Sequence, residues 1–153
     1  VTLELEISNS NVVGIDISED ALKVAGENAM KNNAKVSFQL GNILQPIADI
    51  SDLDILVSNP PYITEKERST MKRNVLDHEP PLALFVSDED PLLFYKAIAR
   101  QGLVSLKQSG LLVVEINEMF GSETANLLSQ LGYHTVEIVK DMDGKDRIVK
   151  AIR

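Results

Sequence analysis

Residues 53–62 read Leu-Asp-Ile-Leu-Val-Ser-Asn-Pro-Pro-Tyr, a stretch in which a short apolar run leads directly into a proline-rich turn. Its first six residues form a short apolar run closed by a turn signal, which predicts a buried strand over residues 53–58. Pro60 and Pro61 remove two backbone N–H donors, and Pro60 keeps Asn59 out of the helical region. The Asn59 side chain and the neighbouring carbonyl groups are therefore held rigidly at the carboxyl end of a strand.

This rigid end of the strand has a chemical use. An amide oxygen and a backbone carbonyl that face one way can accept both hydrogens of one NH2 group. Tyr62 adds a flat face on which a planar amide or base can stack. A planar NH2 nitrogen is a poor nucleophile because its lone pair is delocalised, and two acceptors stabilise the positive charge that develops as it attacks. The alternative is a rigid loop and nothing more, since Asn-Pro is a common turn signal.

The composition is that of an ordinary globular domain. The chain has 153 residues, of which 44% are hydrophobic and 25% charged, which fits one domain, residues 1–153, with a normal core. It has no cysteine, so a disulfide framework, a thiolate nucleophile and a zinc–thiolate site are all excluded. No apolar run approaches the length of a membrane span and no signal-peptide pattern is present, so we expect a cytoplasmic protein without a membrane partner.

The net charge argues against nucleic acid as the main partner. It is −8 at pH 7, whereas a domain that binds a duplex normally carries a basic footprint. The short segment 66–73 contains basic residues, but it also contains an acid, Glu67, and is typical of a solvated loop or helix face.

Strands and helices alternate along the predicted chain. We expect the end of an amphipathic helix over residues 1–7, a strand over 11–16, a helix from the Ser18 cap to about residue 32, and strands over 36–40 and 53–58. A long polar connection follows over residues 63–86. A helix then begins with Asp90 as its cap and Pro91 at its first position. A strand over 111–116, a helix over 122–131 and a hairpin of strands 135–140 and 147–152 complete the chain.

This order predicts an α/β fold whose sheet is parallel except at one edge. Ligands of such sheets bind at the carboxyl ends of the strands, near the switch point of the strand order. Polar side chains follow several of the predicted strands there, at Asp16, Asn42, Asn59 and residues 115–118. Their convergence is a second indication of a site at this edge.

An acid that ends a strand before a helix, followed by Asn-Pro-Pro-Tyr at the end of a later strand, resembles the class I S-adenosylmethionine-dependent methyltransferases, which have a Rossmann-like fold. The chain is most similar to the release-factor glutamine methyltransferases (the HemK type). The matching stretches are Val-Gly-Ile-Asp-Ile-Ser at 13–18, Ser-Asn-Pro-Pro-Tyr at 58–62, Glu79-Pro80 with Ala83-Leu84, and Asp-Met-Asp-Gly at 141–144 with Asp146-Arg147. Adenine-N6 methyltransferases share the Asn-Pro-Pro-Tyr motif, whereas the combination is much more specific.

The resemblance implies a site for the cofactor S-adenosyl-L-methionine. Asp16 would bind its ribose hydroxyls, and the alternative is a solvated or helix-capping acid at the end of a strand. Asn42 stands where the family usually has an acid that contacts the adenine amine, and the alternative is a Gly-Asn turn. Asn59 belongs to the cofactor site as well as to the substrate site.

The resemblance also implies a substrate site. Asn59 and the Pro60 carbonyl would hold the amide of a glutamine side chain, Tyr62 would pack against it, and Pro61 completes the motif. The segment at Glu79 would close over the substrate, and the alternative for Glu79 is a plain loop acid. No metal site is implied.

Several features depart from the family pattern. The glycine-rich loop that normally cradles the cofactor has no counterpart, so we expect a domain truncated at its N-terminus, without the family's first strand and N-terminal helical domain. Alone, such a piece is expected to bind cofactor weakly and to pair its open sheet edges with another copy. Asn117 stands where glycine is usual, which leaves the loop after Glu115 without an assigned role. Arg147 is expected to be structural.

The resulting hypothesis is transfer of a methyl group from S-adenosyl-L-methionine to the side-chain amide nitrogen (N5) of a glutamine in a peptide chain release factor. Direct in-line displacement would need neither a metal nor a covalent enzyme intermediate. One alternative is methylation of an exocyclic amine on DNA or RNA, with a base flipped against Tyr62. The other is a fragment that keeps the fold without the activity.

Overall fold

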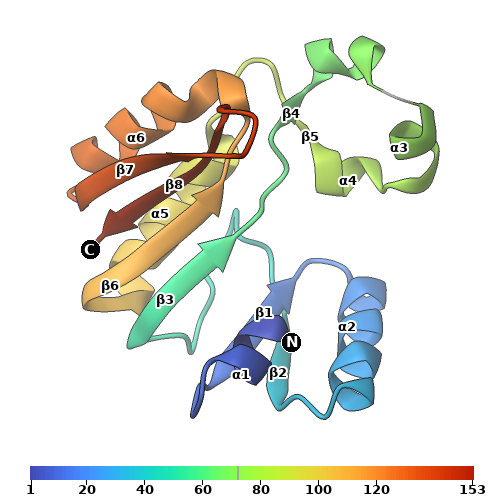
Figure 1. The fold of residues 1–153 in the computed structure, drawn as a ribbon, viewed down its shortest axis with the longest axis vertical. Helices are drawn as coiled ribbons and strands as arrows, with labels where there is room; N and C mark the ends of the chain where they lie inside the picture. The colour runs from blue at the N-terminus through green and yellow to red at the C-terminus, as the bar shows by residue number, and fades with distance from the viewer. Residues whose placement is uncertain (72) are drawn as a thin grey trace. The chain divides into compact units, whose positions relative to one another are not determined.

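The computed structural model describes residues 1–71 and 73–153, and the chain divides into two compact units, Val1–Ile47 and Ala48–Arg153. Figure 1 shows the course of the chain in each. Each unit combines helices with β-strands, as the sequence predicts. Among the described residues, no helix is both long enough and apolar enough to span a bilayer.

The first unit is a small layer of two parallel strands and a long helix. It contains α1 (Thr2–Glu6), β1 (Val12–Asp16), α2 (Glu19–Lys31) and β2 (Val36–Leu40), and β1 pairs with β2 in parallel. The helix α2 begins as predicted, because the Ser18 hydroxyl accepts the Ala21 N–H at 3.2 Å and two acids occupy the first turn. The helix contacts both strands and buries Ala29.

The second unit holds a four-stranded sheet. Its strands are β3 (Leu53–Ser58), β6 (Leu106–Glu115), β7 (His134–Lys140) and β8 (Asp146–Ile152), in the order β3-β6-β8-β7. The pair β3–β6 is parallel, and β8 runs antiparallel to both of its neighbours. The predicted α/β sheet with an antiparallel C-terminal hairpin is confirmed.

Two helices pack against this sheet and form the core with it. The helix α5 (Leu93–Ser105) contacts β3 and β6, and α6 (Gly121–Gln130) contacts β7 and β8. Buried positions alternate along β6 and β8, as the two-residue period of a strand requires. Most of the fully buried side chains come from these elements, among them Tyr95, Ile98, Leu112, Val114, Leu128 and Val149.

Two predicted boundaries were wrong. The helix α5 begins at Leu93 rather than at Pro91, and no described side chain caps it. The Asp90 carboxylate accepts from Lys96 Nζ at 2.7 Å instead. The strand β6 begins at Leu106 rather than at residue 111. The start of β6 could not be recognised from the sequence, because the apolar alternation is interrupted between Leu106 and Leu111. In the structure the pairing of β3 with β6 is irregular here, and Ser109 has a φ of 66°.

The long polar connection predicted over residues 63–86 contains several short elements that the sequence analysis did not identify. It contains β4 (Ile63–Thr64), the 3₁₀ helix η1 (Glu65–Thr70), α3 (Arg73–His78), α4 (Pro81–Leu84) and β5 (Phe85–Val86). The strands β4 and β5 pair in parallel. A capping box starts η1, because the Glu67 carboxylate accepts the N–H of Thr64 at 2.9 Å while the Thr64 side chain accepts from the third residue of the turn.

Candidate active site

A pocket lies at the Asn-Pro-Pro-Tyr motif, just beyond the carboxyl end of β3. Its volume is about 100 Å³. The pocket is lined by Asn59, Pro60, Tyr62, Ile63, Ala83 and Leu84. The motif and the Ala83-Leu84 pair, which were separate signals in the sequence, therefore line one pocket.

Backbone constraints place both sides of this pocket. The strand β3 is paired along its length with β6, which fixes the point at which the chain leaves the sheet. Pro60 is buried there, while Asn59 is exposed and available to a ligand. On the other side, Pro80 is extended and Pro81 opens α4, so that this single helical turn presents Ala83 and Leu84.

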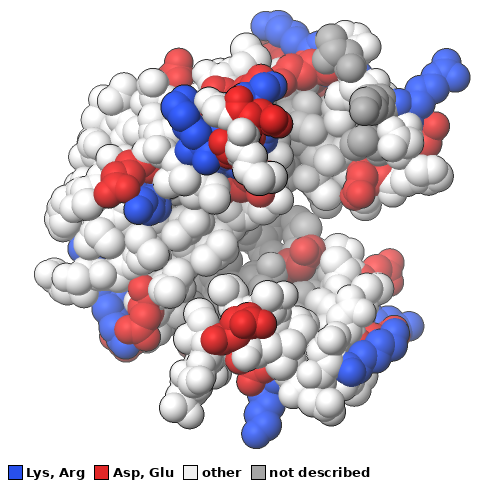
Figure 2. Space-filling view, viewed as in Figure 1, with Lys and Arg blue, Asp and Glu red and all other residues white. Residues whose placement is uncertain are grey.

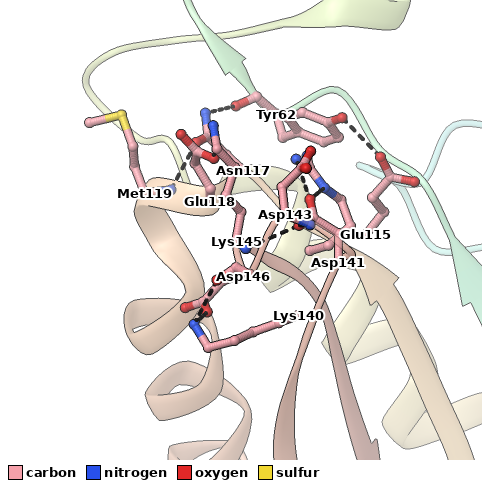
Figure 3. Close-up of polar contacts among 12 residues, drawn as sticks. Tyr62, Glu115, Asn117, Glu118, Met119, Lys140, Asp141, Asp143, Lys145 and Asp146 are labelled. Atoms are coloured by element: carbon pink, nitrogen blue, oxygen red, sulfur yellow. Dashed lines mark hydrogen bonds and ion pairs between the residues drawn. The ribbon is translucent and has the colours of Figure 1, made fainter.

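Tyr62 is held at two points. Its hydroxyl donates to Glu115 Oε1 at 2.9 Å, and its backbone carbonyl accepts from Asn117 Nδ2 at 3.1 Å (Figure 3). Burial raises the pKa of the Tyr62 phenol, and the hydrogen bond to the Glu115 carboxylate raises it further. Tyr62 therefore stays protonated and keeps donating to Glu115.

Asn117 lies at the centre of this network. Its side chain is buried, and Nδ2 also donates to Glu67 Oε2 at 2.9 Å. The Glu67 carboxylate accepts from the Thr64 N–H at 2.9 Å and the Thr64 hydroxyl at 2.7 Å. Sequence reasoning assigned no role to Asn117 and missed Glu67, although the Thr-x-x-Glu spacing of a capping box was a readable signal.

The hairpin turn between β7 and β8 forms a second polar cluster beside the end of β6. The Asp141 carboxylate accepts the N–H groups of Asp143 and Lys145, each at 3.0 Å, and the Arg147 guanidinium at 3.1 Å. These contacts, led by the Lys145 N–H, lower the pKa of Asp141. Arg147 thus has a structural contact, as the sequence predicted. Lys145 also pairs with Glu118 at 2.8 Å, as part of the same polar region (Figure 3).

Two of the three predicted cofactor residues, Asp16 and Asn42, lie in the first unit, at the carboxyl ends of β1 and β2, whereas Asn59 belongs to the second. The exposed Asp16 accepts the Ser18 N–H with Oδ1 at 2.8 Å, and Asn42 accepts the Leu44 N–H at 2.9 Å. These are the capping and turn contacts that the alternative readings expected. Because β1 and β2 are parallel, with Asp16 opposite Leu40, the two side chains lie at the same edge of this sheet. A carboxylate has about four lone-pair sites, so Asp16 retains capacity for ribose hydroxyls.

The described structure brings together only some of the predicted residues. Asn59, Pro60 and Tyr62 share the pocket. Pro61 and Glu79 are not among its six lining residues, and Glu79 is exposed between α3 and α4. Asp16 and Asn42 belong to the other unit.

Methyltransferases are among the solved structures that share this arrangement of strands and helices. A methyltransferase from Pyrococcus furiosus matches 99% of this chain and 66% of its own, with a TM-score of 0.68 at 16% identity. The ribosomal protein L11 methylase of Lactobacillus delbrueckii subsp. bulgaricus matches 94% of this chain and 57% of its own, with a TM-score of 0.58 at 18% identity. The fold is therefore that of the class I S-adenosylmethionine-dependent methyltransferases, as predicted.

Sequence comparison gives the family. The family model described as a methyltransferase domain matches residues 2–139, and the chain belongs to this family. The release factor glutamine methyltransferase of Bacteroides thetaiotaomicron is 42% identical over 154 residues, covering 100% of this chain and 55% of that protein. The enzyme of the same name from Flavobacterium psychrophilum is 40% identical over 150 residues, covering 98% and 53%. The chain thus spans about half the length of these relatives.

Proposed function

We propose that this chain is the catalytic part of an S-adenosyl-L-methionine-dependent protein methyltransferase that modifies the side-chain amide nitrogen (N5) of a glutamine in a peptide chain release factor. The observation that carries the proposal is the pocket at Asn59, which joins the Asn-Pro-Pro-Tyr motif to the Ala83-Leu84 turn. Similarity to release factor glutamine methyltransferases over the whole of this chain supports the same substrate.

The lining of the pocket suits a neutral amide. All six lining residues are uncharged, and four of them are apolar. A carboxylate or an ammonium group would find no compensating charge among these residues. A glutamine amide brings two donors and one acceptor and no net charge, so its hydrogen bonds can be matched by few groups.

Each residue of the motif has a role in this proposal. Asn59 Oδ1 and the Pro60 carbonyl accept the two amide hydrogens, and the flat face of Tyr62 packs against the amide plane. Pro61 stiffens the turn between them. The partial negative charges of Asn59 Oδ1 and the Pro60 carbonyl stabilise the positive charge that develops on the amide nitrogen as it attacks. This is catalysis by prepositioned electrostatics. Glu79 belongs to the segment that would close over the bound peptide.

The residues of the first unit fit the cofactor. When bound, S-adenosyl-L-methionine supplies an electrophilic methyl group on a sulfonium. Asp16 would accept its ribose hydroxyls, and Asn42 would accept from the adenine amine through its side-chain oxygen. Asn59, in the second unit, would contact the cofactor as well as the substrate.

Methylation of a base on DNA or RNA is the competing activity. Net charge disfavours it, since the chain carries −8 at pH 7. On the face drawn in Figure 2, the described basic side chains are scattered among acidic ones and form no continuous basic stripe. A phosphate backbone would find little there to replace its counterions. We place the activity in the cytoplasm, with a protein substrate.

A labelling assay tests this proposal. The full-length natural protein is incubated with methyl-labelled S-adenosyl-L-methionine, a release factor and duplex DNA, and the label is located by mass spectrometry. We expect it on a glutamine of the release factor. Label found only in DNA would reject the proposal.

The variant Asn59→Ala tests the role of the motif in the same assay. It removes one of the two acceptors that face the amide, and loss of one such group typically lowers kcat by ~10²–10³-fold. Asn126→Ala is the matched control, because Asn126 is exposed on α6 and does not line the pocket. Undiminished glutamine methylation by Asn59→Ala would exclude Asn59 from catalysis.

A further inference from the structure

We propose that Glu115 and Asn117 are positioning residues that clamp Tyr62 from both ends and thereby fix the wall of the amide pocket. This inference rests on the proposed function for its effect on catalysis, while the clamp itself is a property of the fold. Neither side chain lines the pocket, so each acts through Tyr62 rather than on the substrate.

Glu115 and Asn117 can act together because they are two residues apart, with Glu115 as the last residue of β6. Alternate residues of an extended strand point to the same side. Ile116 between them is fully buried, and its N–H donates to the Arg147 carbonyl at 2.9 Å, which continues the pairing with β8. Glu115 and Asn117 therefore project from a backbone that the sheet holds in place.

Each residue holds a different part of Tyr62. Glu115 Oε1 accepts from the phenol at 2.9 Å, which restrains the far end of the ring. Asn117 Nδ2 donates to the backbone carbonyl at 3.1 Å, which restrains the main chain at the same residue (Figure 3). Restraints at both ends fix the position of the ring, whose flat face is the surface against which the substrate amide would pack.

The orientation of the Asn117 amide follows from its partners. Its Oδ1 accepts the Met119 N–H at 3.0 Å, and its Nδ2 faces the oxygens of Tyr62 and Glu67. If the amide were flipped, Oδ1 would face the oxygens of Tyr62 and Glu67, and Nδ2 would face the Met119 N–H, so none of these hydrogen bonds could form. Its backbone is anchored as well, since the Asn117 N–H donates to the Tyr95 hydroxyl at 3.2 Å. With 4% of its surface exposed, Asn117 has little solvent to replace these bonds.

Asn117 also restrains a second part of the pocket wall, through its hydrogen bond to Glu67. Its bond to Glu67 at 2.9 Å ties β6 to the capping box at Thr64. Ile63, which lines the pocket, stands between the two residues that are held in this way, Tyr62 and Thr64. A glycine at position 117 would have no side-chain amide and could make none of the contacts of Nδ2 and Oδ1.

The experiment compares variants of the full-length natural protein. Asn117→Asp keeps the shape of the side chain but replaces the donor that faces Tyr62 and Glu67 with an acceptor. We expect kcat for glutamine methylation to fall by about 10–100-fold, since a misplacement of about 1 Å costs up to ~10²-fold, while the KM for S-adenosyl-L-methionine stays unchanged. Glu115→Ala should lower kcat in the same way, and Glu115→Gln should retain activity, because an amide oxygen still accepts from the phenol.

A double-mutant cycle separates positioning from general destabilisation. In a Tyr62→Phe background the phenol is absent, so Glu115→Ala should have no further effect on kcat. Asn117→Ala should keep its full effect there, because it acts on the backbone carbonyl. Glu123→Gln, on the exposed face of α6, is the surface control. Equal effects of Glu115→Ala in both backgrounds would overturn the phenol half of the clamp.

Hydrogen exchange distinguishes a failure of the clamp from a failure of the proposed function. The backbone amides of residues 62–67 should exchange faster in Asn117→Ala than in the wild type, whatever the substrate of the enzyme is. If the wild type methylates no release factor, the proposed function is wrong. The clamp is then tested by the hydrogen-exchange rates of residues 62–67 alone. Unchanged exchange in Asn117→Ala would overturn the clamp even in an active enzyme.

Discussion

At the scale of single residues, Asp141 makes the stability of the fold depend on pH through the tight turn between β7 and β8. Its carboxylate accepts two backbone N–H groups and the Arg147 guanidinium, which lowers its pKa. The charged form is thus favoured in the folded state, so the stabilisation is present above the ordinary pKa of about 3.9 and is lost as pH falls through the lower folded pKa. We expect Asp141→Asn to flatten the loss of stability below about pH 4, measured as the urea midpoint against pH. Asp143→Asn, at an exposed carboxylate, is the control, and parallel curves for wild type and Asp141→Asn would contradict this account.

The two asparagines of the site show what a sequence reveals about individual residues. Asn59 could be predicted, because the prolines that follow it constrain its conformation locally. Its exposed position beside the pocket agrees with that prediction, while its role in catalysis stays a proposal. Asn117 could not be predicted, because its partners Tyr62, Glu67 and Tyr95 lie between 22 and 55 residues away in the chain. Only the folded sheet brings them within hydrogen-bond distance.

At the scale of elements, α5 depends on one small residue. A Cβ added at Gly102 would lie 2.3 Å from the Tyr133 hydroxyl oxygen. That hydroxyl cannot easily move, because it is buried and donates to the Ala99 carbonyl at 2.8 Å, and burial raises its pKa to about 12. We expect Gly102→Ala to destabilise the fold by about 1–3 kcal/mol through overpacking.

The matched control for Gly102 is Gly26→Ala in α2. A Cβ at Gly26 meets nothing within 4 Å, so the substitution should stabilise its helix by about 0.5–1 kcal/mol. Thermal and urea unfolding of both variants check the pair. A Gly102→Ala variant as stable as the wild type would mean that Tyr133 has room to move.

The elements also show where local signals suffice. The strands β2 and β3 were predicted with their observed ends, and α2 began at its predicted cap, because alternation and capping are set by neighbouring residues. The short elements β4 and β5 were missed, since a two-residue strand exists only through its partner, here Ile63 opposite Phe85. Their pairing helps to bring the Ala83-Leu84 turn to the Asn-Pro-Pro-Tyr motif.

At the scale of the whole molecule, the hydrophobic core is unevenly divided. Of the 13 buried hydrophobic residues in the described part of the chain, 12 belong to the second unit, and the first unit contributes Ala29. The sequence composition, which suggests one domain with an ordinary core, could not show this division, because composition carries no information about which residues are buried together. The site proposed for the substrate therefore lies in the unit that holds most of the buried core, as does Asn59, whereas Asp16 and Asn42, which are also proposed for the cofactor, lie in the other unit.

The edge of the four-stranded sheet carries the last prediction. In the described part of the chain, β3 pairs only with β6, and Ile55 and Val57 are 45% and 54% exposed. An edge strand with exposed apolar side chains is a template for another chain, so we expect residues 1–153 to self-associate with increasing concentration in sedimentation velocity. Val57→Lys should shift the chain towards monomer, because a charge on an edge strand opposes pairing. Val104→Lys adds the same charge at a residue that is 70% exposed on α5, outside the sheet, and should leave association unchanged. Equal association of the two lysine variants would show that the contact between copies does not involve β3.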